Sequence, residues 1–422
     1  MPENTRVQRA FELARERYAE LGVDVASAVA RLAEVPLSLH CWQGDDVGGF
    51  ERPDASLSGG GIQVTGGHPG KARTADELRQ DMAAAFALIP GRHRANLHAM
   101  YGAFGERPVE RDEIGVEHYR GWIDWAKGHR LGLDFNATCF SHPKADSGFT
   151  LSHKDPSIRK FWIRHVKRCR TISAEIGREL GTPCLHNLWV PDGSKDLPAD
   201  RWGHRALLKD SLDEIFAVDC PAEEMKDALE SKLFGLGSEA FVVGSHEFYL
   251  SYALSRGKMI CLDMGHFHPT ESVADKLSAV LQFSKELLLH ISRGVRWDSD
   301  HVPVLDDEIS LLMQEVVRSG ALGRVHLALD FFDASIDRVG AWVIGARSVR
   351  KALLLALLEP HDRLKQMEEA GDGFARLALM EEAKTLPFGA VWEHYCATAG
   401  VPTGEALRDA VRAHARDVTS KR

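Results

Sequence analysis

The sequence predicts a (β/α)8 barrel with additional N-terminal helices and a C-terminal helical extension. Two observations lead to this prediction. Short apolar segments alternate with segments of helical periodicity, which is typical of βαβ units in a parallel sheet. Ligand-type side chains follow the last four of these segments, and the strand C-termini of such a barrel form one open face that carries the active site. The 422 residues exceed the roughly 250 of a simple barrel, which leaves room for an appendage.

Period-two alternation and length place the eight expected strands at 36–42, 94–100, 131–136, 183–190, 227–233, 258–264, 286–292 and 324–331. Helical spacing is expected between them at 75–88, 119–127, 158–180, 207–216, 248–255, 274–282 and 307–318, and after the last strand at 342–358. The barrel therefore occupies residues 36–358.

Helices are also expected on both sides of the barrel. Residues 1–35 carry two, which we expect to plug or buttress its closed end. Residues 359–422 carry further helices, predicted at 364–380, 390–397 and 406–418. Apolar side chains in this last region need a partner surface, so we expect an oligomerisation arm; they are Phe374, Leu377, Leu379, Trp392 and Tyr395.

Residues 43–73 are rich in glycine and show no periodicity. A long structureless insertion in a compact domain is usually functional, and most often a lid. We therefore predict an active-site flap, with an ordinary surface loop as the alternative.

Composition excludes several classes of function. The formal net charge is −9 without any block of Lys and Arg, which argues against nucleic-acid or anionic-membrane partners. The seven cysteines are scattered and odd in number, which indicates neither a disulfide framework nor a thiolate zinc site. No apolar run approaches the roughly 18 residues of a membrane span. We expect a soluble, cytoplasmic protein that acts on a small neutral molecule.

Seven ligand-type residues lie at the ends of the last four predicted barrel strands: Glu230, Asp263, His266, His290, Asp298, Asp300 and Asp330. Strand parity turns them toward the barrel interior, and an extended loop would aim Asp298 and Asp300 at one point. Crowded carboxylates and imidazoles call for a counter-charge. Oxygen-rich ligands suit Mn²⁺, Mg²⁺ or Co²⁺, and seven are enough for two cations. Lys232 follows Glu230 by two residues, and a lysine beside cations is expected to face a substrate oxygen.

Structural roles compete with these assignments. An aspartate after a strand commonly caps the following helix, and His290, preceded by three leucines, could be a satisfied core histidine. Trp189 and Trp297 could belong to the core or form a substrate platform. A turn or supporting role is expected for His268 and His326.

Several segments resemble the L-rhamnose isomerase family: LHCWQGDD at 39–46, ESKLFG at 230–235, LD at 262–263, GHFHPTE at 265–271, VRWDSDH at 295–301 and LDFFDAS at 329–335. The resemblance extends over nearly the whole chain. It implies a barrel homotetramer with two cations, normally manganese, that converts L-rhamnose to L-rhamnulose.

The same resemblance implies roles for individual residues. Glu230, Asp263, His290 and Asp330 would hold one cation, and His266, Asp298 and Asp300, with Glu230 bridging, the other. Lys232, His98 and Trp189 match positions near the sugar, and Lys232, His98 and Asp330 are the expected catalytic residues. With O1 facing Lys232, the C2 hydrogen would pass to C1 as hydride, while His98 assists ring opening.

Three alternatives stay open at this point. The first is an isomerase of another aldose or deoxyaldose with the same two-metal chemistry. The second is a metal-dependent phosphoester hydrolase on the same barrel, which the acidic charge balance disfavours. The third is a metal-stabilised binding protein, which would not require Lys232 inside a cation site.

Overall fold

The computed structural model describes residues 3–51, 64–105, 109–232, 239–295 and 299–422. Eight parallel strands close into a barrel in the order β1-β10-β9-β8-β6-β4-β3-β2, which confirms the predicted fold class. They are β1 Pro36–His40, β2 Arg92–His98, β3 Gly132–Asn136, β4 Cys184–Trp189, β6 Met225–Glu230, β8 Met259–Asp263, β9 Leu287–Ile291 and β10 Val325–Leu329.

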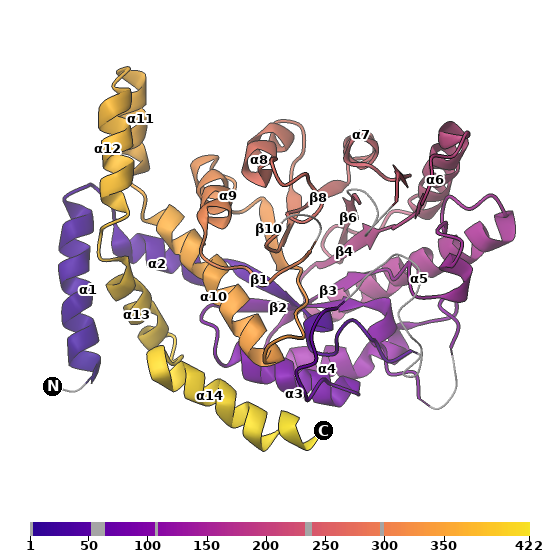
Figure 1. Cartoon of the computed structure of the whole chain (residues 1–422), viewed down its shortest axis with the longest axis horizontal. Coiled ribbons are helices and arrows are strands. Elements are labelled where there is room, and N and C mark those ends of the chain that lie inside the picture. Colours follow the sequence, from indigo (N-terminus) through magenta and orange to yellow (C-terminus); the bar gives the residue numbers. More distant parts are fainter. Residues whose placement is uncertain (1–2, 52–63, 106–108, 233–238, 296–298) are drawn as a thin grey trace.

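Helices surround the barrel (Figure 1). They are α3 Ala75–Phe86, α4 Arg120–His129, α5 Pro156–Leu180, α6 Arg201–Ile215, α7 His246–Arg256, α8 Val273–Leu281, α9 Asp307–Arg318 and α10 Arg338–Leu357. Local sequence sets their ends: Thr74 caps α3 by accepting from the Glu77 amide at 3.2 Å, and α5 stops at Gly181, whose positive φ of 65° suits glycine. The main core fills the space between strands and helices, and a smaller apolar layer fills the barrel interior with Leu185, Ala228, Met259, Cys261, Leu288 and Ala328.

Strand ends differ from the predicted ones by a few residues. The first strand stops at His40, and a 3-10 turn, Cys41–Gln43, carries Trp42. The strand predicted at 94–100 ends at His98, and the one predicted at 227–233 ends at Glu230. These shifts place His98 and Glu230 at the C-terminal mouth of the barrel. A small two-stranded sheet, β5 Gly193–Ser194 with β7 Phe241–Val242, was not predicted, because two-residue strands carry no periodicity.

The prediction for the helices before the barrel holds in part. The two predicted helices exist as α1 Glu3–Ala19 and α2 Val25–Glu34, and α2 lies at the closed end of the barrel. However, α1 packs away from this end, beside α13 (Figure 1). Its Phe11 stacks on His394 with ring centroids 3.7 Å apart. Residues of α2 border a cavity of about 820 Å³ at the N-terminal mouth rather than filling it.

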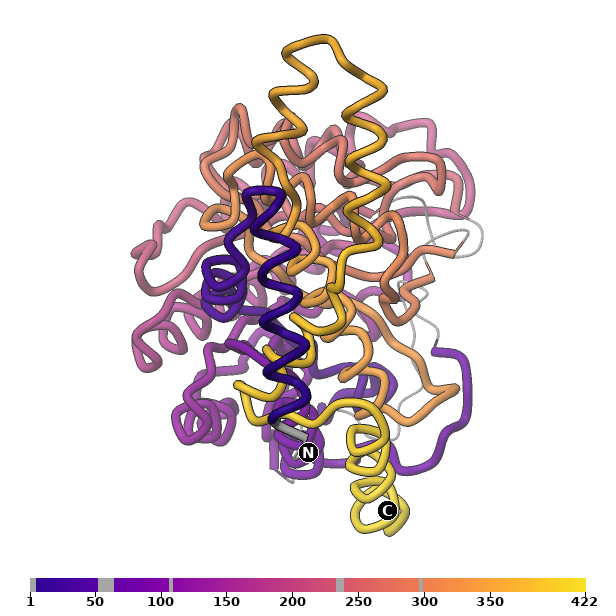
Figure 2. The backbone as a smooth tube through the Cα atoms, turned by 90° about the vertical axis from the view of Figure 1, so that its left-hand side faces the viewer, coloured from indigo at the N-terminus to yellow at the C-terminus, as the bar shows by residue number. Residues whose placement is uncertain are grey.

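The C-terminal region forms α11 His361–Glu369, α12 Gly373–Ala383, α13 Phe388–Thr398 and α14 Gly404–Asp417. The single helix predicted at 364–380 is wrong. Gly371 adopts φ 72° and Asp372 caps α12 by accepting from the Ala375 amide, so the chain reverses there into a projecting α11–α12 hairpin (Figure 2). Every helix of the described ranges is too short or too polar to cross a membrane.

Candidate metal centre and active site

Four of the seven predicted ligands converge at the C-terminal mouth. Glu230, Asp263 and His290 lie near the ends of adjacent strands, with Asp263 paired in register with His290, and Asp330 follows β10 directly. The Nδ1 atom of His290 lies 3.0 Å from Asp330 Oδ2, 3.3 Å from Glu230 Oε2 and 3.6 Å from Asp263 Oδ2. One ligand atom from each of the four residues lies within 4.8 Å of the others.

This cluster is deeply buried. Glu230, Asp263 and His290 are each at most 3% exposed. Among the described residues, Asp263 Oδ2 and His290 Nε2 have no hydrogen-bond partner, which is costly for buried polar atoms. Burial opposes the charged forms, yet the pKa of Glu230 is lowered by the two neighbouring imidazoles and the pKa of His290 is raised well above its usual value by the surrounding acidic groups. A divalent cation fits this donor set, because it would satisfy the orphaned atoms and the excess of carboxylates together.

Cys261 also lies beside Glu230 and His290, and its sulfur could compete as a ligand. Burial raises the pKa of its thiol well above the usual range, so the sulfur stays protonated. A protonated thiol is a poor ligand, since metals bind the thiolate. The oxygen-rich set of Glu230, Asp263, His290 and Asp330 is therefore the favoured one.

The remaining three predicted ligands are only partly placed. His266 joins the cluster, since its Nδ1 lies 3.2 Å from Glu230 Oε1. The chain bends between Asp263 and His266, where the Gly265 amide donates to Asp263 Oδ1 at 2.6 Å. Asp300 accepts a backbone hydrogen bond from the Phe332 amide beyond β10, but its φ of 35° shows that the extended backbone predicted at this residue is wrong. Asp298 lies outside the described residues, as does Trp297.

Lys232 is 1% exposed. Its ammonium donates to Glu239 Oε2 at 2.7 Å and to the Pro191 carbonyl at 3.1 Å. Sequence reasoning missed Glu239, because no periodicity links it to Lys232, seven residues earlier. These two contacts satisfy the ammonium of a buried lysine.

An aromatic wall, made of Trp42, His98, Phe140 and Trp189, extends along the mouth from Asp330 to His266. Successive ring centroids are 4.8 Å, 5.3 Å and 5.6 Å apart, and Trp189 stacks on His266 at 6.2 Å. Trp42 Nε1 donates to Asp330 Oδ1 at 3.0 Å, and Trp189 Nε1 is buried without a partner among the described residues. The wall thus offers an apolar face, with a free donor for a bound molecule.

Two histidines with predicted functional or supporting roles are neutral at ordinary pH. Burial lowers the pKa of His98 to about 3, and its Nδ1 contacts Thr138 Oγ1 at 3.2 Å. His326 lies at the opposite mouth and pairs with Glu286 at 2.7 Å, and burial lowers its pKa as well. His268 takes the expected turn role, since its Nδ1 contacts Thr270 Oγ1 at 2.7 Å.

Sequence reasoning also missed Asn187, whose Nδ2 donates to Glu230 Oε2. Strand parity could have found it, because Asn187 and Trp189 lie on the same face of β4. A closed parallel barrel with a buried carboxylate and imidazole cluster at its C-terminal mouth defines a metal-dependent enzyme for a small polar molecule.

The sequence comparisons give the family. The profile of L-rhamnose isomerase (RhaA) matches residues 5–422. The chain is 59% identical over 416 residues to the L-rhamnose isomerase of Rhodopirellula baltica, covering 99% of this chain and 97% of that one. It is 55% identical over 418 residues to the enzyme of Salmonella paratyphi B, covering 99% of each chain. The chain belongs to the L-rhamnose isomerase family, as its motifs predicted, and the predicted enzyme class, an isomerase, is confirmed.

Solved structures of more distant proteins are also similar. They include D-allulose 3-epimerase from Methylomonas sp., with 12% identity, TM-score 0.46 and coverage of 76% of this chain and 96% of that one. L-ribulose 3-epimerase matches with 10% identity, TM-score 0.47 and coverage of 78% and 97%.

Proposed function

We propose that this chain converts L-rhamnose to L-rhamnulose with two divalent cations, normally Mn²⁺, at the C-terminal mouth of its barrel. The observation that carries the proposal is the convergence of Glu230, Asp263, His290 and Asp330 within 4.8 Å in a member of this family. Mg²⁺ and Co²⁺ suit the same donors.

The two carboxylate oxygens of Glu230 support a bridging role. Oε2 lies against His290 and Oε1 against His266, so each oxygen is directed to a different imidazole. We assign Glu230, Asp263, His290 and Asp330 to one cation. His266, Asp298 and Asp300, together with Glu230, are assigned to the other.

Adjacent divalent cations, when bound, polarise O1 and O2 of the open-chain sugar as Lewis acids. The residues of the chain stabilise the charge that develops, pack against the sugar and exclude water. Lys232, held in place by Glu239, faces O1 and stabilises the negative charge that develops there as the hydrogen at C2 passes to C1 as hydride. The O2–H and C2–H bonds break, a C1–H bond forms, C2 becomes the carbonyl, and the proton released from O2 ends on O1. The aromatic wall packs against the apolar face of the sugar and keeps water away from the hydride.

His98 assists ring opening in this scheme. Its ring is neutral, because burial lowers its pKa to about 3, so it can donate a hydrogen bond to the ring oxygen or accept one from the O1 hydroxyl.

Replacing His98 by Asn is expected to lower kcat on ring-closed L-rhamnose by about 100-fold, the usual scale for losing a positioned proton-transfer group. Manganese affinity should stay close to the wild-type value, because His98 is not among the ligands. Steady-state kinetics and calorimetric titration with Mn²⁺ measure the two quantities. His93→Asn, on the opposite end of β2, is the matched control. An equal loss in both quantities would show that His98 supports the metal site instead.

The function is tested by incubating the manganese-loaded protein with L-rhamnose deuterated at C2 and, in parallel, with a panel of aldohexoses and deoxyhexoses. We expect ketose formation to be fastest with L-rhamnose, and deuterium to remain in the L-rhamnulose. Complete washout of the label into solvent would favour an enediol route. Faster turnover of another aldose would reassign the substrate, and turnover of phosphate esters without sugar turnover would contradict the isomerase altogether.

We further propose that the 359–422 helices form an oligomerisation arm of a homotetramer, separate from the 36–358 barrel with its 43–73 flap and from the 1–35 helices. Phe374 is 84% exposed and Leu377 56% exposed on α12, which supports a partner surface there. Trp392, Tyr395 and Leu379 do not support it, since the chain itself buries them. All seven cysteines are free thiols, which is in keeping with a cytoplasmic location.

A further inference from the structure

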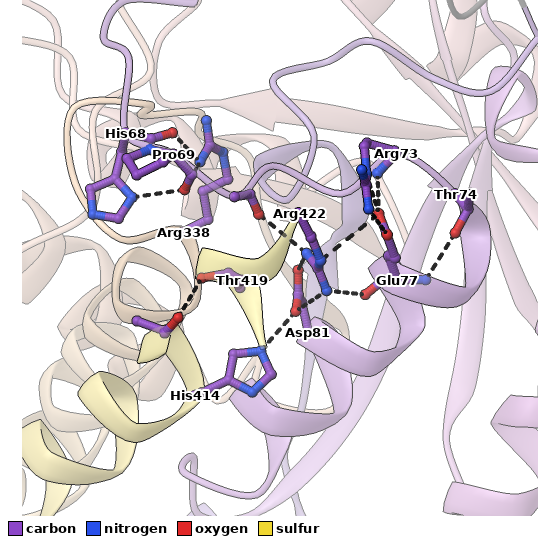
Figure 3. A network of polar contacts seen from close by, with 12 residues as sticks. His68, Pro69, Arg73, Thr74, Glu77, Asp81, Arg338, His414, Thr419 and Arg422 are labelled. Atoms are coloured by element: carbon purple, nitrogen blue, oxygen red, sulfur yellow. Dashed lines mark hydrogen bonds and ion pairs between the residues drawn. The ribbon is translucent and has the colours of Figure 1, made fainter. Parts of the chain in front are cut away.

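Two arginines hold the segment that returns from the glycine-rich loop to α3. We call residues 64–73 the return limb. One arginine, Arg338, lies at the start of α10, and the other, Arg422, follows α14 (Figure 3). Both side chains are nearly buried, at 6% and 5% exposure, which is unusual for residues at the surface end of a helix.

Arg338 joins both ends of the loop. It makes a bidentate pair with Asp46, with both nitrogen–oxygen distances at 2.8 Å, and donates to the carbonyl of His68 at 2.7 Å. A bidentate guanidinium–carboxylate pair fixes orientation as well as distance. Arg338 therefore binds both the start of the glycine-rich loop, at Asp46, and the return limb, at His68.

Arg422 holds the return limb from the other side. Its guanidinium pairs with Asp81 of α3, which is 3% exposed, and donates to the Gly70 carbonyl at 3.2 Å. His414 also contacts Asp81, at 2.7 Å. Gly70 lies so close that a Cβ there would be 2.6 Å from the Thr419 carbonyl oxygen, and its φ of 83° requires glycine. The backbones of Gly70 and Thr419 are thus closely packed, in addition to the contact that the Arg422 side chain makes with Gly70.

The return limb in turn touches the loop that carries Asp330. The His68 amide donates to the Ala334 carbonyl at 2.7 Å, and the Ala334 amide donates to the Thr65 carbonyl at 3.2 Å. The side chain of Gln43 brackets Asp333 of the same loop, accepting from its amide at 2.7 Å and donating to its carbonyl at 2.9 Å. A continuous set of contacts therefore leads from Arg422 to a ligand of the candidate metal centre.

We infer that Arg422, with Asp81, is a positioning residue for the active site: it presses the return limb against the 331–337 loop and thereby fixes Asp330 and the adjoining aromatic wall. The inference deepens the proposed function and rests on it for its kinetic part. Arg422, which follows α14 and is far along the chain from every proposed ligand, thus stabilises the substrate site.

The test replaces Arg422 by Ala in the full-length, manganese-loaded protein. Hydrogen exchange of the His68, Ala72 and Ala334 amides, which bond within this network, should become about tenfold faster. The KM for L-rhamnose should rise about tenfold, the scale seen when a supporting partner is removed, and kcat should fall as well, because Asp330 is assigned both to the metal centre and to catalysis. Arg422→Lys should recover part of the KM. Arg412→Ala is the matched control, because Arg412 lies on α14 with 66% of its side chain exposed and pairs with Glu405 and Asp409.

A second variant keeps the ion pair between Arg422 and Asp81. It therefore separates the loss of positioning from unfolding of the chain. Gly70→Ala leaves both charges in place but forces the return limb away from Thr419, and Gly67→Ala, with nothing within 4 Å of its Cβ, is its control. Faster exchange together with a raised KM in both Arg422→Ala and Gly70→Ala supports the inference. Faster exchange with an unchanged KM would show that Arg422 has a purely structural role, and would overturn the inference. Unchanged exchange in Arg422→Ala would overturn it too. If the wild type did not turn over L-rhamnose, the proposed function would fail, while exchange would still decide whether Arg422 holds the limb.

Discussion

Glu230→Gln is expected to lower kcat for L-rhamnose by about 1,000-fold, or about 4 kcal/mol of transition-state stabilisation. Glutamine keeps the shape of the side chain and an acceptor for the Asn187 amide, but it removes the charge that lies between His290 and His266. A neutral amide oxygen is a much weaker ligand for a divalent cation and a poor bridge. Kinetics at saturating Mn²⁺, together with metal content after dialysis, measure the effect.

The control is Glu286→Gln, at the opposite mouth of the same barrel, where the carboxylate pairs with Lys226 and His326. This variant should retain the wild-type kcat. Wild-type kcat and metal content in Glu230→Gln would exclude Glu230 from the metal centre and would contradict the two-cation assignment.

Removal of metal by a chelator is expected to abolish isomerisation and to lower the melting temperature by about 3 °C. At a cation concentration 100 times its dissociation constant, binding to the folded state stabilises it by about 2.7 kcal/mol, which is then lost. Added Mn²⁺ should restore both activity and melting temperature, because the buried Asp263 Oδ2 and His290 Nε2 regain a partner.

Glu230→Gln separates the specific site from general binding of cations. Its melting temperature should respond much less to Mn²⁺ than that of the wild type. Equal responses in the two proteins would place the stabilising ion elsewhere. Calorimetry before and after chelation, with Ca²⁺ as a comparison ion, gives these values.

The order of the strands and the inward orientation of four ligands could be predicted from sequence, because both follow from local periodicity. Strands of five to seven residues alternate with helices, and a period of two places Glu230, Asp263 and His290 on the inner face. Asp330 follows a strand of the same kind. The substrate was predicted from the family motifs, because the periodicity of the sequence carries no information about it.

Contacts between distant segments could not be predicted in this way. The pairs Trp42–Asp330 and Asn187–Glu230 join residues 288 and 43 positions apart, and they depend on barrel closure. The reversal at Gly371 was missed because helical spacing continues on both sides of it, although Gly371 and Asp372 are the residue types that end one helix and cap the next. The position of α1 was missed for a similar reason. It packs on α13, near the other end of the chain, and local periodicity does not show this contact.

The mouth of the barrel is divided between two tasks. The proposed cation ligands lie on the neighbouring strands β6, β8 and β9 and directly after β10. Another group of residues follows or ends β1, β2, β3 and β4, namely Trp42, His98, Phe140 and Trp189. We expect substitutions of the first group to alter the chemistry itself, and substitutions of Phe140 and Trp189 in the second group to reshape the space for the sugar. Directed evolution toward other aldoses therefore has a natural target in the β3 and β4 half, at Phe140 and Trp189.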